Sequence, residues 1–273
     1  MLKKYIVILI SSLLFTSCAS KKHKNVSYLD EKSQVSEKPT LNIFTPKNAN
    51  ESNPVLIFIH GGNWNSGDKK IYSFLGRNFA KKGIVTVIAG YTLSPNANYD
   101  VMAQQIAKAV IWTKGNISNY KGNPNKIFLT GHSAGGHLIA LIGTNPKYLE
   151  DKSIIKGIIL NDAAGLDMKH YLEENPPTEK NDYLTTWTSN PEKWKDASPI
   201  YFVNEKTPRM MIYLGEKTYE SIKVGTTRFT KELNKYQPTV KPIMINKKHA
   251  AMVLQYFFSC SDRYDEIIAF MNK

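Results

Sequence analysis

The chain has 273 residues, of which 42% are hydrophobic, and a formal net charge of +13 at pH 7. This length and composition suit one large buried core, because single α/β domains commonly reach about 250 residues. The lysines are spread along the chain without a basic, aromatic-rich patch, which excludes a nucleic-acid partner and favours a surface near an anionic membrane. With only two cysteines, Cys18 and Cys260, a disulfide framework is also excluded.

The first segment, residues 1–17, has the pattern of a secretory signal peptide, in which Lys3 and Lys4 precede an apolar run over residues 5–15. The run is shorter than the roughly 20 apolar residues that a permanent membrane-spanning helix needs. The four residues before Cys18, Leu-Phe-Thr-Ser, resemble a bacterial lipobox. This resemblance implies lipidation of Cys18, so we expect a lipoprotein of the bacterial cell envelope, anchored to a membrane and facing the periplasm or the exterior.

Residues 18–38 are polar and rich in Lys and Ser, with few large apolar side chains. Such a segment cannot bury enough surface to fold alone, so we predict a flexible tether between the lipid and a domain that spans residues 39–273. Cys260 follows two phenylalanines and precedes a helix-like C-terminal segment. We expect it to be a small buried hydrophobic residue.

Short apolar runs alternate with amphipathic segments along the folded domain. Strands are predicted at residues 41–45, 55–60, 84–89, 126–130, 156–161, 209–214 and 242–246. Helices are predicted at residues 68–82, 99–114, 133–142, 227–236 and 261–271. Several strands are almost entirely apolar, as strands covered on both faces are. The alternation predicts an α/β fold, with a mostly parallel central sheet and helices on both faces.

The segment of residues 166–202 interrupts this alternation. It has two consecutive prolines, many charges and three large aromatic residues, Tyr183, Trp187 and Trp194. Two interpretations stay open: an insertion that acts as a lid or cap, and a surface excursion with a short helix. The aromatic side chains would line an acyl or aryl pocket, or would fix the loop to the domain.

The motif Gly131-His132-Ser133-Ala134-Gly135 lies between a predicted strand and a predicted helix. In this context Gly-x-Ser-x-Gly forms a tight turn, in which the glycines relieve crowding and the serine hydroxyl is raised above the sheet. The helix N-terminus adds positive potential where an oxyanion develops. Ser133 is therefore predicted to be a nucleophile.

A second motif, His-Gly-Gly-Asn-Trp beginning at His60, directly follows an apolar strand. The backbone amides of Gly61 and Gly62, with that of Ala134 behind the nucleophile, are expected to form an oxyanion hole for a tetrahedral intermediate. His60 is expected to brace this loop by hydrogen bonds, and Trp64 to pack against the domain.

Together, the His-Gly-Gly-x-Trp and Gly-His-Ser-Ala-Gly-Gly-His motifs resemble those of the α/β-hydrolase superfamily, close to its esterase and arylformamidase-like branches. The resemblance covers the chain from Leu41 to its C-terminus. It implies a central sheet of about eight strands, so that residues 39–273 form an α/β-hydrolase catalytic domain. It also implies a Ser-acid-His triad in that chain order, no metal and no organic cofactor.

The histidine of such a triad comes late in the chain, where it can accept the serine proton. His249 follows the last predicted strand and lies on a loop at its end. The other histidines lie in the predicted tether, in the two glycine motifs or in the insertion. His249 is therefore predicted to be the general base.

The acid is where the sequence departs from the superfamily pattern, because Thr218 stands where the aspartate is expected. Asp162, after the preceding predicted strand, is the first candidate and resembles the pancreatic-lipase arrangement, in which the acid lies one strand earlier. Glu220 and Asp167 are alternatives, and Asp167 is equally suited to capping a helix. A Ser-His dyad supported by Thr218 or Glu216 is also open.

These motifs predict a serine hydrolase that cleaves carboxylic esters of small or aryl substrates through an acyl-enzyme, with a small-molecule ester as its partner. An arylformamidase-like amidohydrolase is an alternative, because the His-Gly-Gly-x-Trp motif is shared and the insertion aromatics would hold an aryl ring. A non-catalytic binding protein with a hydrolase fold is supported only by the unusual acid position. The sequence leaves the oligomeric state open.

Overall fold

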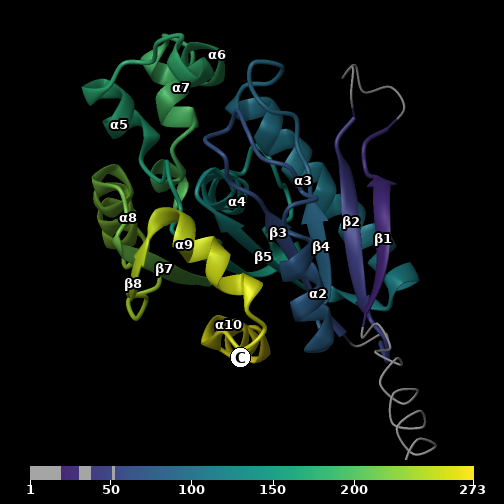
Figure 1. Cartoon of the computed structure of the whole chain (residues 1–273). Helices are drawn as coiled ribbons and strands as arrows, with labels where there is room; N and C mark the ends of the chain where they lie inside the picture. Colours follow the sequence, from purple (N-terminus) through teal and green to yellow (C-terminus); the bar gives the residue numbers. More distant parts are fainter. Residues whose placement is uncertain (1–19, 31–37, 51–52) are drawn as a thin grey trace, which may run out of the picture.

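The central element of the protein is one eight-stranded sheet, seen in a computed structural model that describes residues 20–30, 38–50 and 53–273 (Figure 1). Its order is β1-β2-β4-β3-β5-β6-β7-β8. The strands are β1 Ser20–Ser27, β2 Thr40–Pro46, β3 Asn53–Ile59, β4 Val85–Ala89, β5 Gly122–His132, β6 Ile155–Asn161, β7 Met210–Lys217 and β8 Ile243–Lys248. Only the pairings of β2 with β1 and β4 are antiparallel among these strands, which confirms the prediction of a mostly parallel sheet.

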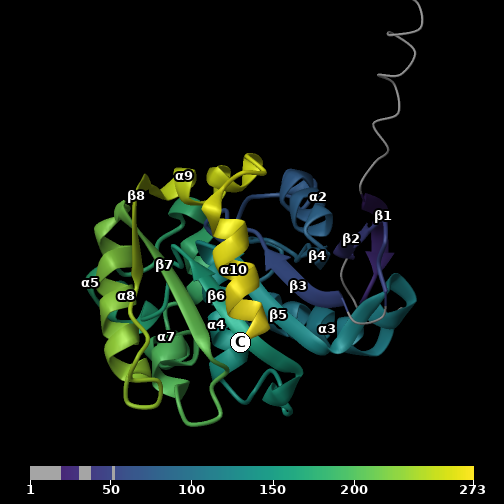
Figure 2. The ribbon, with the colours of Figure 1, turned by 90° about the horizontal axis from the view of Figure 1, so that it is seen from below.

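Helices cover both faces of the sheet (Figure 2). The main ones are α2 Ser73–Lys81, α3 Tyr99–Asn116, α4 Ala134–Thr144, α8 Glu220–Leu233, α9 His249–Leu254 and α10 Asp262–Asn272. Successive side chains of β3 point to opposite faces of the sheet, so this strand contributes to the core on both faces. Val55 and Ile57 belong to the core with α3 and α4, whereas Leu56 and Phe58 belong to the core with α2 and α10. This double burial is why the central strands β3, β4 and β6 are largely apolar.

The predicted tether is wrong for residues 20–27, which form the edge strand β1 and pair antiparallel with β2. An edge strand needs no core of its own, because β2 satisfies its backbone groups and its charged side chains can face solvent. Tyr28 is buried directly after it, and its hydroxyl donates to the Gly90 carbonyl at 2.8 Å. The predicted signal peptide and Cys18 lie outside the described residues.

The predicted insertion, residues 166–202, lies between β6 and β7 and is named the cap below. It contains α5 Met168–Glu174, η3 Lys180–Asp182, α6 Tyr183–Trp187, α7 Pro191–Asp196 and η4 Pro199–Phe202. Its three α-helices are grouped at the top of Figure 1. Trp187 and Trp194 are buried and fix the cap to the domain, whereas Tyr183 lines a pocket. The prediction that these aromatic side chains line a pocket is therefore confirmed for Tyr183, and the prediction that they fix the segment to the domain is confirmed for Trp187 and Trp194.

Two smaller expectations need correction. Cys260 is exposed rather than buried, because the apolar stripe of α10 that follows it, with Tyr264, Ile267 and Met271, takes the buried positions. The helix expected at residues 227–236 begins earlier, at Glu220. Within the part of the chain that the structure describes, no helix is long and apolar enough to cross a bilayer.

Candidate active site

Ser133 sits on the tight turn between β5 and α4, with φ 55° and ψ −122°. This left-handed conformation is strained for a residue with a side chain. Neighbouring glycines are required by close packing: a Cβ on Gly131 would lie 2.6 Å from the Gly135 carbonyl carbon, and one on Gly135 would lie 2.2 Å from the Ile59 oxygen. The glycines of the motif thus let β5, α4 and β3 meet beneath the serine.

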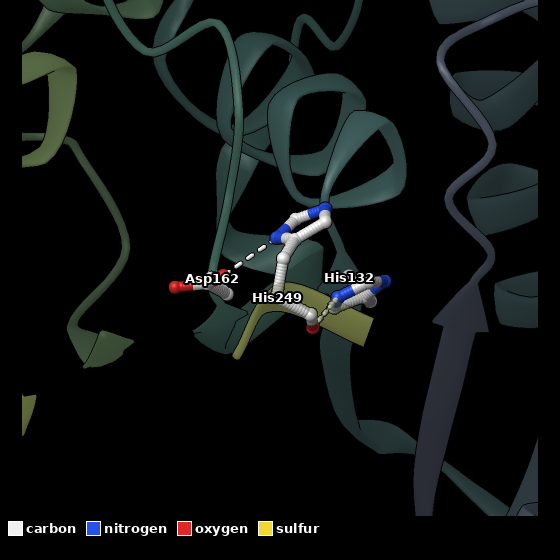
Figure 3. Close-up of side chains that lie close together, drawn as sticks. All are labelled: His132, Asp162 and His249. Atoms are coloured by element: carbon white, nitrogen blue, oxygen red, sulfur yellow. Dashed lines mark hydrogen bonds and ion pairs between the residues drawn. The ribbon is translucent and has the colours of Figure 1, made fainter. Parts of the chain in front are cut away.

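His249 is the first residue of α9, directly after β8. Its Nε2 lies 2.9 Å from Ser133 Oγ, and its Nδ1 lies 2.6 Å from Asp162 Oδ2. Figure 3 shows the Asp162 carboxylate pointing at the His249 ring. The structure therefore brings together the predicted nucleophile, the predicted base and the first candidate for the acid.

Asp162 follows the end of β6, where it is fully buried with φ 53°. Its Oδ1 accepts the Gly215 amide at 2.8 Å, and its Oδ2 accepts the Thr218 hydroxyl as well as the His249 ring. Thr218 Oγ1 is also 3.4 Å from His249 Nδ1. Thr218 therefore supports a carboxylate that comes from one strand earlier, and does not replace it.

The alternative acids are engaged elsewhere. Glu220 begins α8, is exposed and pairs with Lys223 at 3.6 Å. Asp167 caps α5 by accepting the His170 amide, and its carboxylate lies 2.7 Å from Arg228 Nε. The expectation that Asp167 caps a helix is confirmed, and its partners leave it and Glu220 outside the relay to His249.

The loop of the second motif lies against the nucleophile. A Cβ on Gly61 would be 2.9 Å from the Ser133 Cβ, and Gly62 has φ 126°, which side chains rarely adopt. Among the described residues, the amides of Gly61, Gly62 and Ala134 donate to no other backbone group outside the regular elements. Three amides near the serine are thus left to bind an oxygen. His60 Nδ1 lies 2.8 Å from the Gly61 carbonyl, which confirms its bracing role.

Trp64 does more than pack, and this was missed from the sequence. Its Nε1 donates to His137 Nδ1 at 3.1 Å, and His137 Nε2 donates to the Ala197 carbonyl of the cap at 2.7 Å. The cap also holds the same loop through the Tyr183 hydroxyl, which donates to Asn63 Oδ1 at 2.8 Å. The oxyanion loop, α4 and the cap therefore form one connected unit. The sequence signal for this connection was His137, the histidine that ends the Gly-Gly-His run after Ser133.

Both histidines that flank the turn are uncharged near neutral pH. Burial, together with the nearby His249, lowers the pKa of His132 to about 4. Burial also lowers the pKa of His137 to about 4. His132 Nε2 lies 3.0 Å from the His249 carbonyl, so it donates there and fixes the start of α9 (Figure 3).

Side-chain donor atoms of His132, Asp162 and His249 all lie within 4.8 Å of one another, a spacing that could also hold a metal ion. Their hydrogen bonds point to a different use. Asp162 and His249 face one another, His249 continues to Ser133, and His132 turns to a backbone carbonyl. These directed pairs form a relay, which is the arrangement that proton transfer needs.

Ser133 opens into a pocket of about 660 Å³. One wall comes from the cap, with Met168, Tyr171 and Tyr183, and another comes from the segment that contains Tyr219 and Ile222. Trp64 and Leu254 also line it. A pocket with aromatic and aliphatic walls suits an apolar acyl or aryl group.

A serine on a strained strand-to-helix turn, joined to a histidine and an acid from later strand ends, defines the class of α/β-hydrolases. Within that class, the family model described as BD-FAE matches residues 41–224, and the chain belongs to this family. The resemblance to the esterase and arylformamidase-like branches of the superfamily is confirmed.

Curated relatives include esterases and a formamidase. The chain is 29% identical over 178 residues to esterase LipC of Mycobacterium tuberculosis, a match that covers 60% of this chain and 44% of that protein. It is 34% identical over 102 residues to kynurenine formamidase of Salmo salar, a match that covers 37% of this chain and 33% of that protein. The chain therefore spans less than half the length of these two relatives.

Solved structures agree on the fold. Esterase B from Lactobacillus rhamnosis superposes with a TM-score of 0.72 at 18% identity, covering 99% of this chain and 92% of that one. A truncated carbohydrate esterase from gut microbiota superposes with a TM-score of 0.72 at 22% identity, covering 92% of this chain and 97% of that one. At these identities the likeness shows the α/β-hydrolase fold.

Proposed function

We propose that the protein is a serine hydrolase of carboxylic esters, with Ser133, His249 and Asp162 as its catalytic triad. The observation that carries this proposal is the unbroken relay from Ser133 Oγ to His249 Nε2 at 2.9 Å and from His249 Nδ1 to Asp162 at 2.6 Å. The relay also argues against a non-catalytic binding protein, because a scaffold without chemistry gains nothing from a strained serine aimed at a histidine.

The reaction follows from these positions. His249 Nε2 takes the hydroxyl proton as Ser133 Oγ attacks the ester carbonyl, and the amides of Gly61, Gly62 and Ala134 bind the oxyanion that forms. Collapse of the tetrahedral intermediate breaks the bond to the leaving alcohol, which receives the proton from His249. Water then repeats the sequence on the acyl-enzyme and releases the acid. Asp162 holds the imidazole in the required tautomer and stabilises the imidazolium.

Small or aryl esters are the substrates we propose for this site. The aromatic walls of the pocket, with Tyr171, Tyr183 and Tyr219, suit an aryl or short acyl group, and the volume of about 660 Å³ suits a small molecule. LipC, an esterase by name, supports ester hydrolysis.

An arylformamidase-like activity is the second candidate, favoured by the similarity to kynurenine formamidase and by the same aromatic walls. Both substrates pass through the same acyl-enzyme chemistry and differ in the leaving group. Comparing kcat/KM for phenyl acetate and for an N-formyl aryl amide separates them: the ester is expected to be preferred, and a preference for the formamide would reverse the order.

The direct test is the Ser133→Ala variant. Without the nucleophile, turnover of p-nitrophenyl acetate is expected to fall by about 10⁵-fold or more, because removal of the serine alone disables the whole triad. Circular dichroism serves as the control for folding. A folded variant that keeps the activity of the unchanged protein would overturn the assignment.

We further propose that the protein is a lipoprotein of the bacterial cell envelope, held in a membrane by a lipid on Cys18. The charged and apolar pattern of residues 1–17 and the lipobox-like residues before Cys18 support this. Metabolic labelling with a fatty-acid analogue in a bacterial host is expected to mark the protein and to miss the Cys18→Ala variant. Equal labelling of both would exclude this attachment site.

A further inference from the structure

An apolar surface, named the ridge below, lies where α2 meets the turn η5 Gln255–Phe257. Its large side chains are Leu254, Phe257 and Phe258, which are 57%, 63% and 64% exposed. The ring of Phe74 lies 5.5 Å from that of Phe257, and the ring of Phe257 lies 5.8 Å from that of Phe258. Contiguous exposed groups of this size mark an interaction surface rather than ordinary scattered exposure.

The ridge is held in place by the fold. The Asn78 side chain of α2 is buried and donates to the carbonyl oxygens of Tyr256 at 3.2 Å and Phe257 at 3.4 Å. These bonds fix η5 against α2, so the phenylalanines protrude from an ordered turn. Burial of the rest of α2, with Leu75 and Phe79, keeps its outer side facing solvent.

The ridge is continuous with the mouth of the active-site pocket. Leu254 belongs to the ridge and also lines the pocket, and it lies on the same short helix as His249. Tyr72 lines the pocket as well, and its ring lies 6.2 Å from that of Phe74. A partner that covers the ridge would therefore lie beside the mouth of the pocket that contains Ser133.

Positive charge flanks the ridge on the β1 side. Lys22 of β1 donates to the Ser73 hydroxyl of α2 at 2.8 Å, which joins the two elements, and Figure 2 shows α9, α2 and β1 along one edge of the molecule. Burial lowers the pKa of Lys22, and the nearby cations Lys24 and Arg77 lower it further. Arg77 lies one helical turn from Phe74.

Two acidic groups near this face are paired with lysines. Asp68 lies 3.7 Å from Lys70, and Asp265 lies 2.7 Å from Lys82. These pairs leave the charge of Lys22, Lys24 and Arg77 in excess. We name these three residues the basic flank.

We propose that the ridge and the basic flank dock on an anionic phospholipid bilayer, so that the pocket mouth opens at the lipid–water interface. Phenylalanine and leucine partition into the headgroup and acyl boundary, while lysine and arginine are attracted to anionic lipids. A second copy of this chain is a poorer occupant, because a symmetric contact would bring two basic flanks together. Esters that accumulate at a membrane surface would then reach Ser133 directly.

The test uses the chain from Ala19 to Lys273, which contains every described element and carries no lipid on Cys18. Co-sedimentation is measured with vesicles of phosphatidylcholine, with and without phosphatidylglycerol. Binding is expected only to the anionic vesicles and is expected to weaken as salt is added. Absence of binding to the anionic vesicles would overturn the proposal.

Matched variants locate the surface. Replacing Phe257 and Phe258 together by Ser is expected to lower the partition into anionic vesicles about tenfold or more, and Arg77→Glu to lower it as well. Ile111→Ser, on α3 with the side chain 52% exposed, is the control and should leave partition unchanged. Equal losses in all variants would contradict a defined docking face.

Two further readouts separate the possible failures. Hydrolysis of soluble p-nitrophenyl acetate should be unchanged in the Phe257/Phe258 variant, because neither residue lines the pocket. A failure of the proposed membrane docking can therefore be told apart from a failure of the proposed ester hydrolysis, because the two are measured separately. Light scattering detects the other occupant: a dimer that the same substitutions dissociate, without vesicle binding, would replace the bilayer with a second copy of the chain.

Discussion

Thr218 belongs to the active site, where its hydroxyl lies against the carboxylate of Asp162. Its position is the one where the superfamily pattern expects the acid, and its hydroxyl instead donates to the carboxylate of Asp162. The sequence placed Asp162 first among several acids but could not decide, because the choice depends on how close β6, β7 and α9 come in space. Ser133 and His249 were easier, since each follows a recognisable strand.

Asp162→Asn tests the acid directly. Asparagine has nearly the same shape but cannot stabilise the imidazolium of His249, so kcat for p-nitrophenyl acetate is expected to fall by about 10⁴-fold. Glu220→Gln, the matched change at the rejected candidate, should leave kcat unchanged because Glu220 is exposed on α8. The assignment is wrong if the two variants behave alike, or if only Glu220→Gln is inactive.

Gly61→Ala tests the oxyanion loop at the same scale. A methyl group there would meet the His132 oxygen at 2.8 Å and the Ser133 Cβ at 2.9 Å, so the loop must shift away from the nucleophile. We expect kcat to fall on the order of 10²-fold or more. Gly115→Ala in α3, where a Cβ meets nothing within 4 Å, should keep kcat and gain up to about 1 kcal/mol of stability. Steady-state kinetics and thermal unfolding of both variants supply the comparison.

At the scale of elements, all seven strands predicted from the sequence are present. Burial on both faces makes the central strands β3, β4 and β6 apolar runs, whereas β8, at the sheet edge, alternates between half-buried and exposed residues. β1 escaped prediction because a lysine-rich edge strand has the composition of a linker, and its pairing with β2 is a tertiary contact. The hydrogen-bonded bridge from Trp64 through His137 to the cap could not be predicted from the sequence for the same reason. It needs the folded position of Ala197, more than a hundred residues from Trp64.

The two buried histidines that flank Ser133 predict how stability depends on pH. His132 and His137 have pKa values of about 4 in the fold, whereas an unfolded histidine titrates near 6.5. Between these values the unfolded chain binds more protons, so the free energy of unfolding falls as the pH is lowered from about 6.5 to 4. The expected slope is about 1.4 kcal/mol per pH unit for each histidine.

Chemical denaturation across this pH range measures the slope. His60, whose pKa is lowered by burial, adds to the fall in the same direction. His137→Gln removes one titrating group and should reduce the slope by about 1.4 kcal/mol per pH unit. A slope that is unchanged in this variant would show that His137 is not held neutral in the fold.

For the whole molecule, the pairing of β1 with β2 makes residues 20–27 part of the domain. Removal of residues 1–27 would strip the hydrogen bonds that β1 makes to β2 and expose a new sheet edge. We expect the free energy of unfolding to fall by roughly 3–6 kcal/mol, at about 1 kcal/mol for each backbone bond lost. Removal of residues 1–18 is the control and should leave stability unchanged. Equal denaturation midpoints for the two truncations would show that residues 20–27 add no stability, as expected of a flexible tether.

The position of β1 also bears on the proposed attachment to a membrane. Cys18 stands two residues before Ser20, so a lipid there would be attached close to the start of β1. Lys22 then joins β1 to α2, the helix that borders the ridge. β1 and the helix that borders the ridge are therefore neighbours, and the proposed lipid attachment and the proposed docking face can each be removed without the other.

The central claim is that Ser133 is a nucleophile activated by His249. Reaction of the protein with a fluorophosphonate probe, followed by mass spectrometry of its peptides, measures this most directly, because such probes bond covalently to activated serines. This activation predicts one adduct, on the peptide that contains Ser133, and none in the Ser133→Ala or His249→Ala variants. An unlabelled protein, or an adduct on another serine, would contradict it.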